Sequence, residues 1–154
     1  MLYLVDTGVL LRLFNRAAPL HAKIRQCLRE QRIAGHGFAI SPQNVAEFWN
    51  VSTRPASARG GYGLSIEVTE RRVRALERIC EVLPESADLY PLWRRLVVHH
   101  QVRGVQVYDA RLVAWMKTQA ITHIITLNDG DFARYPGIVA KTPEALVISS
   151  GSTS

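Results

Sequence analysis

Short apolar runs separated by longer amphipathic stretches form the main pattern in this chain. Residues 2–5, 38–40 and 123–126 are almost wholly apolar and have the length of buried strands, and residues 79–83 form a fourth candidate before Pro84. Between these runs, capping residues and apolar residues at helical spacing predict helices. The predicted helical regions are 9–14, 20–32, 41–51, 65–78, 86–99 and 108–119.

Strands that are apolar throughout and alternate with helices indicate a parallel sheet covered on both faces, and therefore an α/β fold. At 154 residues, the chain has the length of one domain that buries roughly two-thirds of its unfolded surface. We predict a single domain over residues 1–148, because no repeat or internal boundary is visible. The small polar residues 149–154 predict a disordered tail.

The charge balance favours a polyanionic partner. Nineteen Lys and Arg against thirteen Asp and Glu give a net charge of +6 and a sequence pI near 9.8, and sixteen of the nineteen cations are arginine. Arginine binds phosphate in a bidentate manner and stacks on bases, which suits nucleic acid. A high-GC genome also enriches arginine, so composition alone leaves both explanations open.

Cysteine usage and hydropathy predict a cytoplasmic protein. Cys27 and Cys80 are widely spaced, without the Cys and His clusters of a zinc module. No apolar stretch approaches the roughly 18 residues of a membrane span, and the first strand begins without a basic leader segment. We therefore expect no membrane association.

Four acidic residues interrupt or end apolar segments: Asp6, Glu47, Asp109 and Asp131. An ionised carboxylate beside an apolar run loses hydration and is retained where it is paired, hydrogen-bonded or bound to metal. Three of these acids follow predicted strands, at the edge of a parallel sheet where ligands bind. Four carboxylates close together repel one another unless a divalent cation is present, and all-oxygen ligands select Mg²⁺ or Mn²⁺. Such a site suits metal-assisted hydrolysis of phosphodiesters, in which activated water attacks the phosphorus.

Ordinary explanations exist for two of these acids. Asp109 is at the start of a predicted helix, where a carboxylate serves as a cap. Glu47 has a candidate partner in a nearby arginine. The triplet Asp6-Thr7-Gly8 is also similar to that of aspartic proteases, but those enzymes are all-β and need a second triplet. An acyl-phosphate phosphatase needs a second aspartate at position 8, where Gly8 stands.

Four ordered motifs together resemble the PIN-domain ribonucleases, and within them the VapC toxins of type II toxin–antitoxin operons. The resemblance covers nearly the whole chain, over 5–7, 44–48 followed by 52–55, 108–114 and 125–132. It implies a three-layer α/β/α sandwich with a central, mostly parallel sheet, and Mg²⁺-dependent cleavage of RNA, with Mn²⁺ as a substitute. It also implies a homodimer and a cognate antitoxin protein that occludes the site.

The resemblance implies that Asp6, Glu47 and Asp109 bind Mg²⁺ directly or through water. The fourth ligand is assigned to Asp131, with Asn128 and Asp129 as alternatives, and Thr126 is a candidate hydrogen-bond donor to a ligand carboxylate. The chain departs from the family at two positions. Gly8 stands where asparagine is usual, which is expected either to loosen the turn after Asp6 or to remove a hydrogen bond. Tyr108 stands where close relatives often carry histidine.

Other functional residues are predicted from surface composition. The arginines of the 54–78 region are candidates for gripping the RNA backbone, with Arg54, Arg59 and Arg71 as the assigned substrate-binding residues. The adjacent His99 and His100 are predicted to be surface or core-edge residues. The three tryptophans are expected in the core or at dimer contacts more than as base-stacking platforms: Trp49, Trp93 and Trp115. A PIN-like module that binds RNA or protein without cutting remains the alternative function.

Overall fold

The structure, a computed structural model, describes residues 1–148. The predicted tail, 149–154, lies outside the described residues. Along the chain the elements are β1 (Leu2–Val5), α1 (Thr7–Leu13), α2 (His21–Ile33), β2 (Gly37–Ile40), α3 (Pro42–Thr53), α4 (Ile66–Ile79), β3 (Glu81–Val82), α5 (Leu89–His99), α6 (Gln106–Thr118), β4 (His123–Ile125), the 3₁₀ helix η1 (Asp129–Phe132), β5 (Val139–Lys141) and α7 (Pro143–Leu146).

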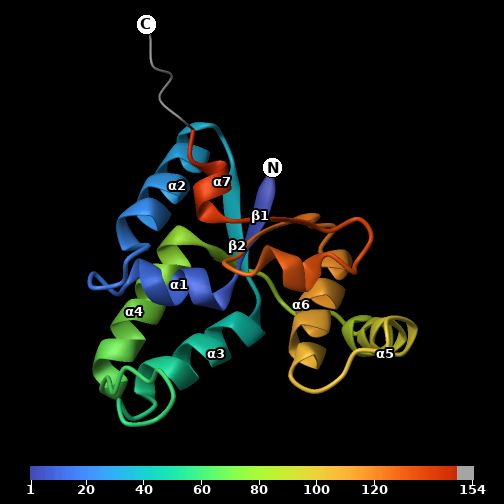
Figure 1. The fold of residues 1–154 in the computed structure, drawn as a ribbon, viewed down its shortest axis with the longest axis horizontal. Helices are drawn as coiled ribbons and strands as arrows, with labels where there is room; N and C mark the ends of the chain where they lie inside the picture. Colours follow the sequence, from blue (N-terminus) through green and yellow to red (C-terminus); the bar gives the residue numbers. More distant parts are fainter. Residues whose placement is uncertain (149–154) are drawn as a thin grey trace, which may run out of the picture.

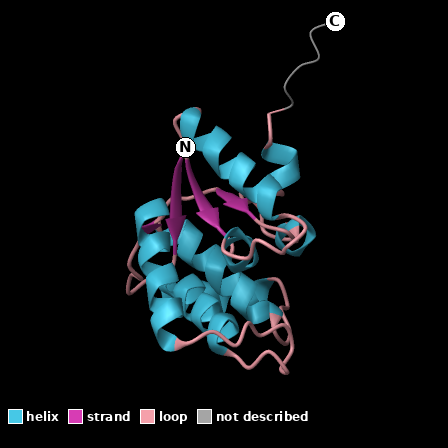
Figure 2. Cartoon of the chain, turned by 90° about the vertical axis from the view of Figure 1, so that its left-hand side faces the viewer, coloured by secondary structure: helices cyan, strands magenta, loops and turns pink. Residues whose placement is uncertain are grey.

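The five strands form one parallel sheet in the order β3-β2-β1-β4-β5. Figure 2 shows neighbouring strands running in the same direction between helices. The chain moves outward from β1 to β2 and β3, and then returns to the other side of β1 as β4. The strand order therefore reverses between β1 and β4, and the crevice beyond their carboxyl ends is the expected ligand site of such a sheet.

Alternate residues of β1 pack into separate clusters on the two faces of the sheet. Tyr3 and Val5 belong to a cluster with residues of α1, α2, α3 and α4, whereas Leu4 packs with residues of α5 and α6. Figure 1 shows these two helical groups on either side of the strands. The predicted three-layer α/β/α sandwich is confirmed, and the parallel sheet excludes the all-β architecture of aspartic proteases.

Several boundaries differ from the predictions. The strand predicted over 79–83 is only Glu81–Val82, both exposed at the sheet edge. The helix expected from Ser86 begins at Leu89, because Ser86 forms a turn in which its carbonyl accepts from the Leu89 amide. Helix α3 continues to Thr53 and ends before Pro55, since a residue preceding proline disfavours helical backbone. Strand β5 and helix α7 were not predicted.

The loop after α3 folds back onto the helix end. The amides of Tyr62, Gly63 and Leu64 donate to the carbonyls of Val51, Arg54 and Ser52 respectively. A side chain at Gly61 would collide with the Pro55 and Arg54 backbone, its Cβ falling only 2.4 Å from the Pro55 oxygen. The predicted surface loop is thus held at its base by backbone hydrogen bonds and close approach.

Two further observations concern the expected environment of the protein. Within the described residues, no helix has the length and apolar character needed to cross a membrane. Cys27 and Cys80 are both buried and free. Burial raises the pKa of the Cys27 thiol to about 11 and that of Cys80 to about 12, so both behave as core residues.

Candidate active site

Asp6 lies immediately after β1, at the point where the strand order reverses. It is the N-cap of α1, and its Oδ1 accepts a 2.8 Å hydrogen bond from the Thr7 amide. Its Oδ2 accepts a 2.7 Å hydrogen bond from the hydroxyl of Thr126, which follows β4. Thr126 was predicted as a donor to a ligand carboxylate, and the structure places it in that position. Burial raises the pKa of Asp6, with smaller contributions from Glu47 and Asp131, while the two hydrogen bonds lower it.

Glu47 projects from α3 toward Asp6 and is fixed at both carboxylate oxygens. The Thr7 hydroxyl donates to Oε2 over 2.6 Å, and the Gln43 amide donates to Oε1 over 2.8 Å. The Thr7 hydroxyl itself accepts from the side-chain amide of Asn44, which belongs to the capping box of α3. The partners of Glu47 are therefore neutral polar side chains, and within residues 1–148 Glu47 forms no salt bridge with an arginine.

Asp109 lies in the first turn of α6, half-buried, and is not the helix cap. The N-cap position is Val105, so the capping explanation is wrong, although the helix N-terminus still favours the charge. Burial raises the pKa of Asp109 to about 6, and repulsion from Asp6, Asp131 and Glu47 adds to the effect. The charges of the other three predicted acids therefore act on Asp109.

The loop after β4 carries the contested fourth acid. Asp131 is exposed on η1, and its charge raises the pKa of both Asp6 and Asp109. Asp129 is exposed and accepts a hydrogen bond from the next amide, that of Gly130. The amide of Asn128 donates to the Thr126 hydroxyl, so Asn128 supports Asp6 through its backbone. Asp131 as the fourth ligand stays a prediction, with Asn128 and Asp129 as its alternatives.

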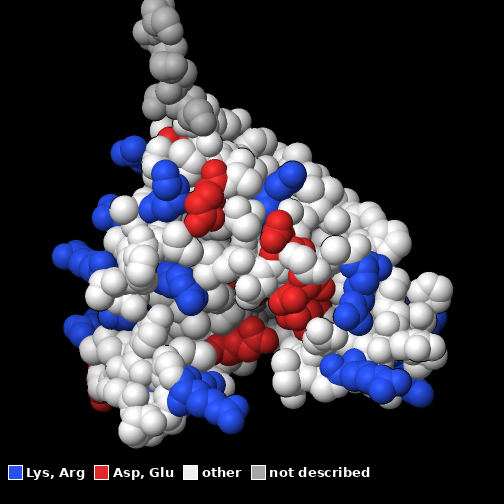
Figure 3. All heavy atoms as spheres, viewed as in Figure 1, with Lys and Arg blue, Asp and Glu red and all other residues white. Residues whose placement is uncertain are grey.

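The chemistry of the four acids suits a hard divalent cation, although these candidate ligands are not gathered around one point. Figure 3 shows acidic side chains concentrated in the hollowed middle of one face, with Lys and Arg on both sides. Within residues 1–148, no three Asp, Glu, His or Cys side chains already surround a common metal position. Asp6 and Glu47 are fixed by neighbours, whereas Asp109 and Asp131 accept no side-chain hydrogen bond among the described residues. Carboxylate oxygens and their unrelieved repulsion fit magnesium.

Gly8, where the family usually has asparagine, leaves the turn after Asp6 intact. The amides of Val9 and Leu10 both donate to the Asp6 carbonyl, so α1 begins regularly at Thr7. A Cβ at Gly8 would have its nearest contacts at 3.6 Å, with Arg12 and Leu127, an ordinary packing distance. The expected loosening is therefore absent, and the structure gives no steric reason for glycine at this position.

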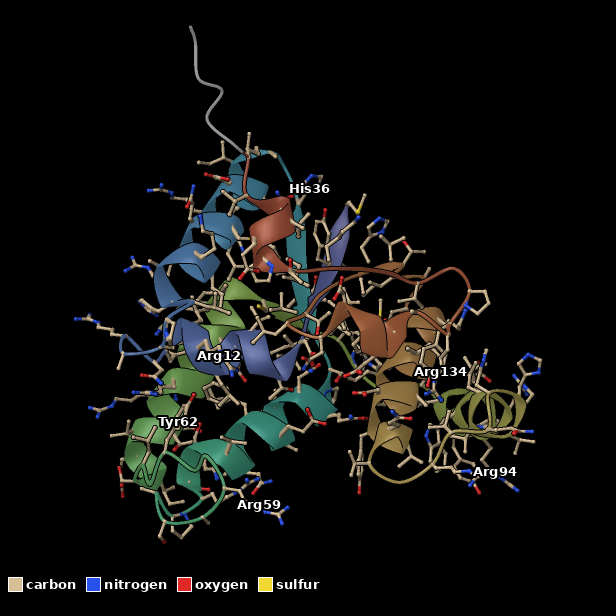
Figure 4. The ribbon with its side chains drawn as sticks, in the orientation of Figure 1. Arg12, His36, Arg59, Tyr62, Arg94 and Arg134 are labelled. Carbon is tan, nitrogen blue, oxygen red and sulfur yellow. The ribbon has the colours of Figure 1, made fainter. Side chains whose placement is uncertain are left out.

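The predicted substrate arginines lie at the end of α3, in the loop that follows it and on α4. Arg54 donates from Nη1 to the Arg59 carbonyl, which holds the loop together. Arg59 and Arg71 are exposed. Figure 4 shows Arg59 below α3, in the loop that follows this helix. Arg134, which sequence reasoning missed, follows η1, and its positive charge lowers the pKa of Asp109.

The sequence interpretation of histidine and tryptophan is borne out in part. His99 is exposed and His100 is half-buried, as expected for surface and core-edge positions. Trp115 is 1% exposed in the core, and Trp49 packs against the cluster on the opposite face. Trp93 is also half-buried, but it lines a cavity as well as contacting the core.

Comparison with known proteins agrees with this arrangement. The PIN domain family matches residues 3–138. Ribonuclease VapC48 of Mycobacterium tuberculosis is 31% identical over 141 residues, covering 90% of this chain and 94% of that protein. Among solved structures, VapBC2 of Rickettsia felis bound to a promoter DNA fragment has a TM-score of 0.66 and 16% identity, over 92% of this chain and 98% of the other. The sarcin-ricin loop cleaving toxin VapC20 of Mycobacterium tuberculosis has a TM-score of 0.61 and 20% identity, over 88% and 95%.

The chain belongs to the PIN-domain family and, within it, to the VapC ribonucleases. The family match spans all four motifs that carry the acids. Two residues that support the acids, Thr7 and Asn44, were visible in those motifs but had no role assigned from sequence. Both residues are polar and both are buried, but their burial is visible only in the structure.

Proposed function

We propose that this protein is a magnesium-dependent endoribonuclease that acts as the toxin of a toxin–antitoxin pair in the cytoplasm. The observation that carries the proposal is the hydrogen-bonded placement of Asp6 and Glu47 beside the reversal of strand order, where Thr7 contacts both carboxylates and Thr126 reaches Asp6 from the loop that carries Asp131. Burial, followed by repulsion from Asp6, Asp131 and Glu47, raises the pKa of Asp109 to about 6, which agrees with this placement. Its kinship with ribonuclease VapC48 supports RNA as the substrate. Manganese is expected to substitute for magnesium because it accepts the same oxygen ligands.

In this proposal, Asp6 and Glu47 hold the cation from fixed positions, and Asp109 and Asp131 complete the ligand set. When bound, the ion supplies Lewis acidity that activates water and offsets the charge developing on the scissile phosphate. Thr126 and Thr7 orient the two fixed carboxylates through hydrogen bonds. Arg134, whose charge acts on Asp109, is our candidate for contact with the phosphate backbone, and the exposed Arg59 and Arg71 would extend the basic surface.

The test is cleavage of total RNA by purified protein with magnesium, with EDTA, and with the variant Asp6→Asn. Cleavage is expected with magnesium or manganese only, and only in the wild type. Activity that survives EDTA and Asp6→Asn would contradict the metal mechanism. Absence of cleavage on every RNA, together with RNA binding, would instead favour a module that binds without cutting.

The partner is proposed from the structural relatives, several of which are toxin–antitoxin complexes, including VapBC-1 of nontypeable Haemophilus influenzae. Expression of the protein alone should arrest growth, and expression of the small protein encoded beside it should restore growth. Co-purification of the two proteins would support direct binding. Size-exclusion chromatography with light scattering would also test the proposed homodimer.

A further inference from the structure

An aromatic cavity lies on the α5 side of the carboxylates. It has a volume of about 480 Å³ and is walled by the rings of Tyr90, Trp93 and Tyr108, with Arg111 and Glu85 at its polar side. This volume is within the range of about 300–1,000 Å³ that is usual for ligand pockets. Neither the acids nor the arginines assigned to the RNA backbone line it. The aromatic cavity is therefore lined by residues other than those assigned to the metal and the RNA backbone.

The aromatic cavity is joined to the carboxylates through α6 and Gln43. Tyr108 precedes Asp109, and successive helical residues point about 100° apart, so one turn of α6 borders both sites. The Gln43 amide donates to Glu47 and also to the Tyr108 carbonyl. The Gln43 oxygen accepts from Arg111 over 3.0 Å. A single side chain thus links a predicted ligand to two residues of the cavity wall.

The walls offer ring faces and one hydrogen-bonding edge. Tyr90 and Tyr108 are 62% and 59% exposed, which is unusual for two large aromatic side chains beside one cavity. The Trp93 indole nitrogen donates to the Val107 carbonyl over 2.9 Å, so its only polar atom is occupied and its ring remains for stacking. Arg111 and Glu85 form a 2.9 Å ion pair at the polar side of the cavity, and both side chains are 33% exposed.

We propose that the aromatic cavity receives one unpaired base of the RNA substrate, next to the phosphate that is cleaved. The inference rests on the proposed ribonuclease function and deepens it. The base stacks on the tyrosine and tryptophan rings, while Arg111 and Glu85 face its polar edge. Exposed arginines on the same helix as Tyr90 and Trp93, Arg94 and Arg95, match the negative backbone that accompanies such a base; Arg94 is labelled on α5 in Figure 4.

The inference is tested with short single-stranded RNAs that carry the fluorescent base 2-aminopurine at each position in turn. Full-length protein with Asp6→Asn binds these RNAs without cutting them, in buffer with magnesium. Quenching is expected at one position of the RNA, because stacking on an aromatic ring quenches this base. Tyr90→Ala and Tyr108→Ala should each abolish the quenching and weaken binding by roughly 5- to 150-fold, the effect of one lost stacking contact.

The matched controls are Tyr90→Phe and Tyr108→Phe, which keep the ring and remove the hydroxyl. They should retain both quenching and affinity, and circular dichroism should show that all four variants are folded. Quenching that is absent, or that survives both alanine changes, would overturn the base site even if wild-type protein still cleaves RNA. Alanine variants that weaken only self-association or antitoxin binding would show that the cavity is a protein contact. Failure of wild-type cleavage would count against the ribonuclease proposal, and the quenching result would still decide the base site.

Discussion

The hydroxyl of Thr126 donates a 2.7 Å hydrogen bond to Oδ2 of Asp6, from the end of β4 to the end of β1. The same hydroxyl accepts from the Asn128 amide, so its direction is fixed. Thr126 is fully buried. The residue that orients the first carboxylate thus comes from 120 positions away in sequence, across the reversal in strand order.

We expect Thr126→Val to lower the affinity for magnesium and the rate of RNA cleavage by about 10- to 100-fold, the usual effect of losing a group that orients a metal ligand. Valine has nearly the same shape but no hydroxyl, so Asp6 loses its donor and the Asn128 amide loses its acceptor. Isothermal titration with magnesium and a cleavage time course provide the two measurements. Thr126→Ser keeps the hydroxyl and should remain much closer to wild type; equal losses in both variants would refute the hydrogen-bond explanation.

Asp109→Asn is expected to stabilise the metal-free protein at neutral pH while abolishing cleavage. The folded-state pKa of Asp109 is about 6, above the ordinary value of 3.8, because of burial first and like charges second. Ionising it therefore costs the folded state stability, by about 1 kcal/mol once solvent screening is allowed for. This penalty is absent below pH 3.8, grows as pH rises, and is complete above pH 6.

Urea unfolding in EDTA at pH 4.5 and pH 7.5 measures this effect. The stability advantage of Asp109→Asn over wild type should be larger at pH 7.5, and adding magnesium should stabilise wild type but not the variant. Asp88→Asn, a change at an exposed aspartate before α5, is the control and should show no such pH dependence. An advantage that is equal at both pH values would contradict the assigned repulsion and burial.

Gln43→Ala should reduce RNA cleavage because Glu47 loses a hydrogen-bond donor, although no charge is removed. The change removes the donors to Glu47 and to the Tyr108 carbonyl and the acceptor for Arg111. We expect a loss of about 10-fold in magnesium affinity, since Glu47 keeps only its hydrogen bond from Thr7. Gln26→Ala removes a comparable glutamine-to-glutamate contact on α2, with Glu30, and should leave magnesium affinity unchanged.

The salt dependence of RNA binding distinguishes arginines that contact a phosphate from arginines that only hold the loop together. If Arg59 or Arg71 contacts a phosphate, its change to alanine should lower the slope of log affinity against log salt by about 0.7, the value for one contact to a single strand. Arg54 already donates to the Arg59 carbonyl, so Arg54→Ala should mainly lower the melting temperature by loosening the loop. Filter binding between 50 and 200 mM salt gives the slopes. Unchanged slopes for both Arg59→Ala and Arg71→Ala would remove these residues from the RNA site.

The sequence by itself determined the fold class and the location of the acids. Residues 2–5 and 38–40 lack polar alternation because their strands are covered on both faces, and this fact alone implies a parallel sheet with helices on each side. Parallel strands bring their carboxyl ends to one edge, so the residue after each strand was a site candidate. Strand β5 was not predicted from the sequence, because an edge strand of three residues with exposed ends has no such apolar run.

Only the tertiary structure decided how the carboxylates are held. Thr7 meets Glu47 across 40 residues and Thr126 meets Asp6 across 120, and no local pattern encodes such pairs. The tertiary structure also showed that Asp109 is not the N-cap of α6 and that the charges of the other three acids act on it. Hydrogen bonds and repulsion depend on distances through space, and those distances exist only once the strands have taken their order in the sheet.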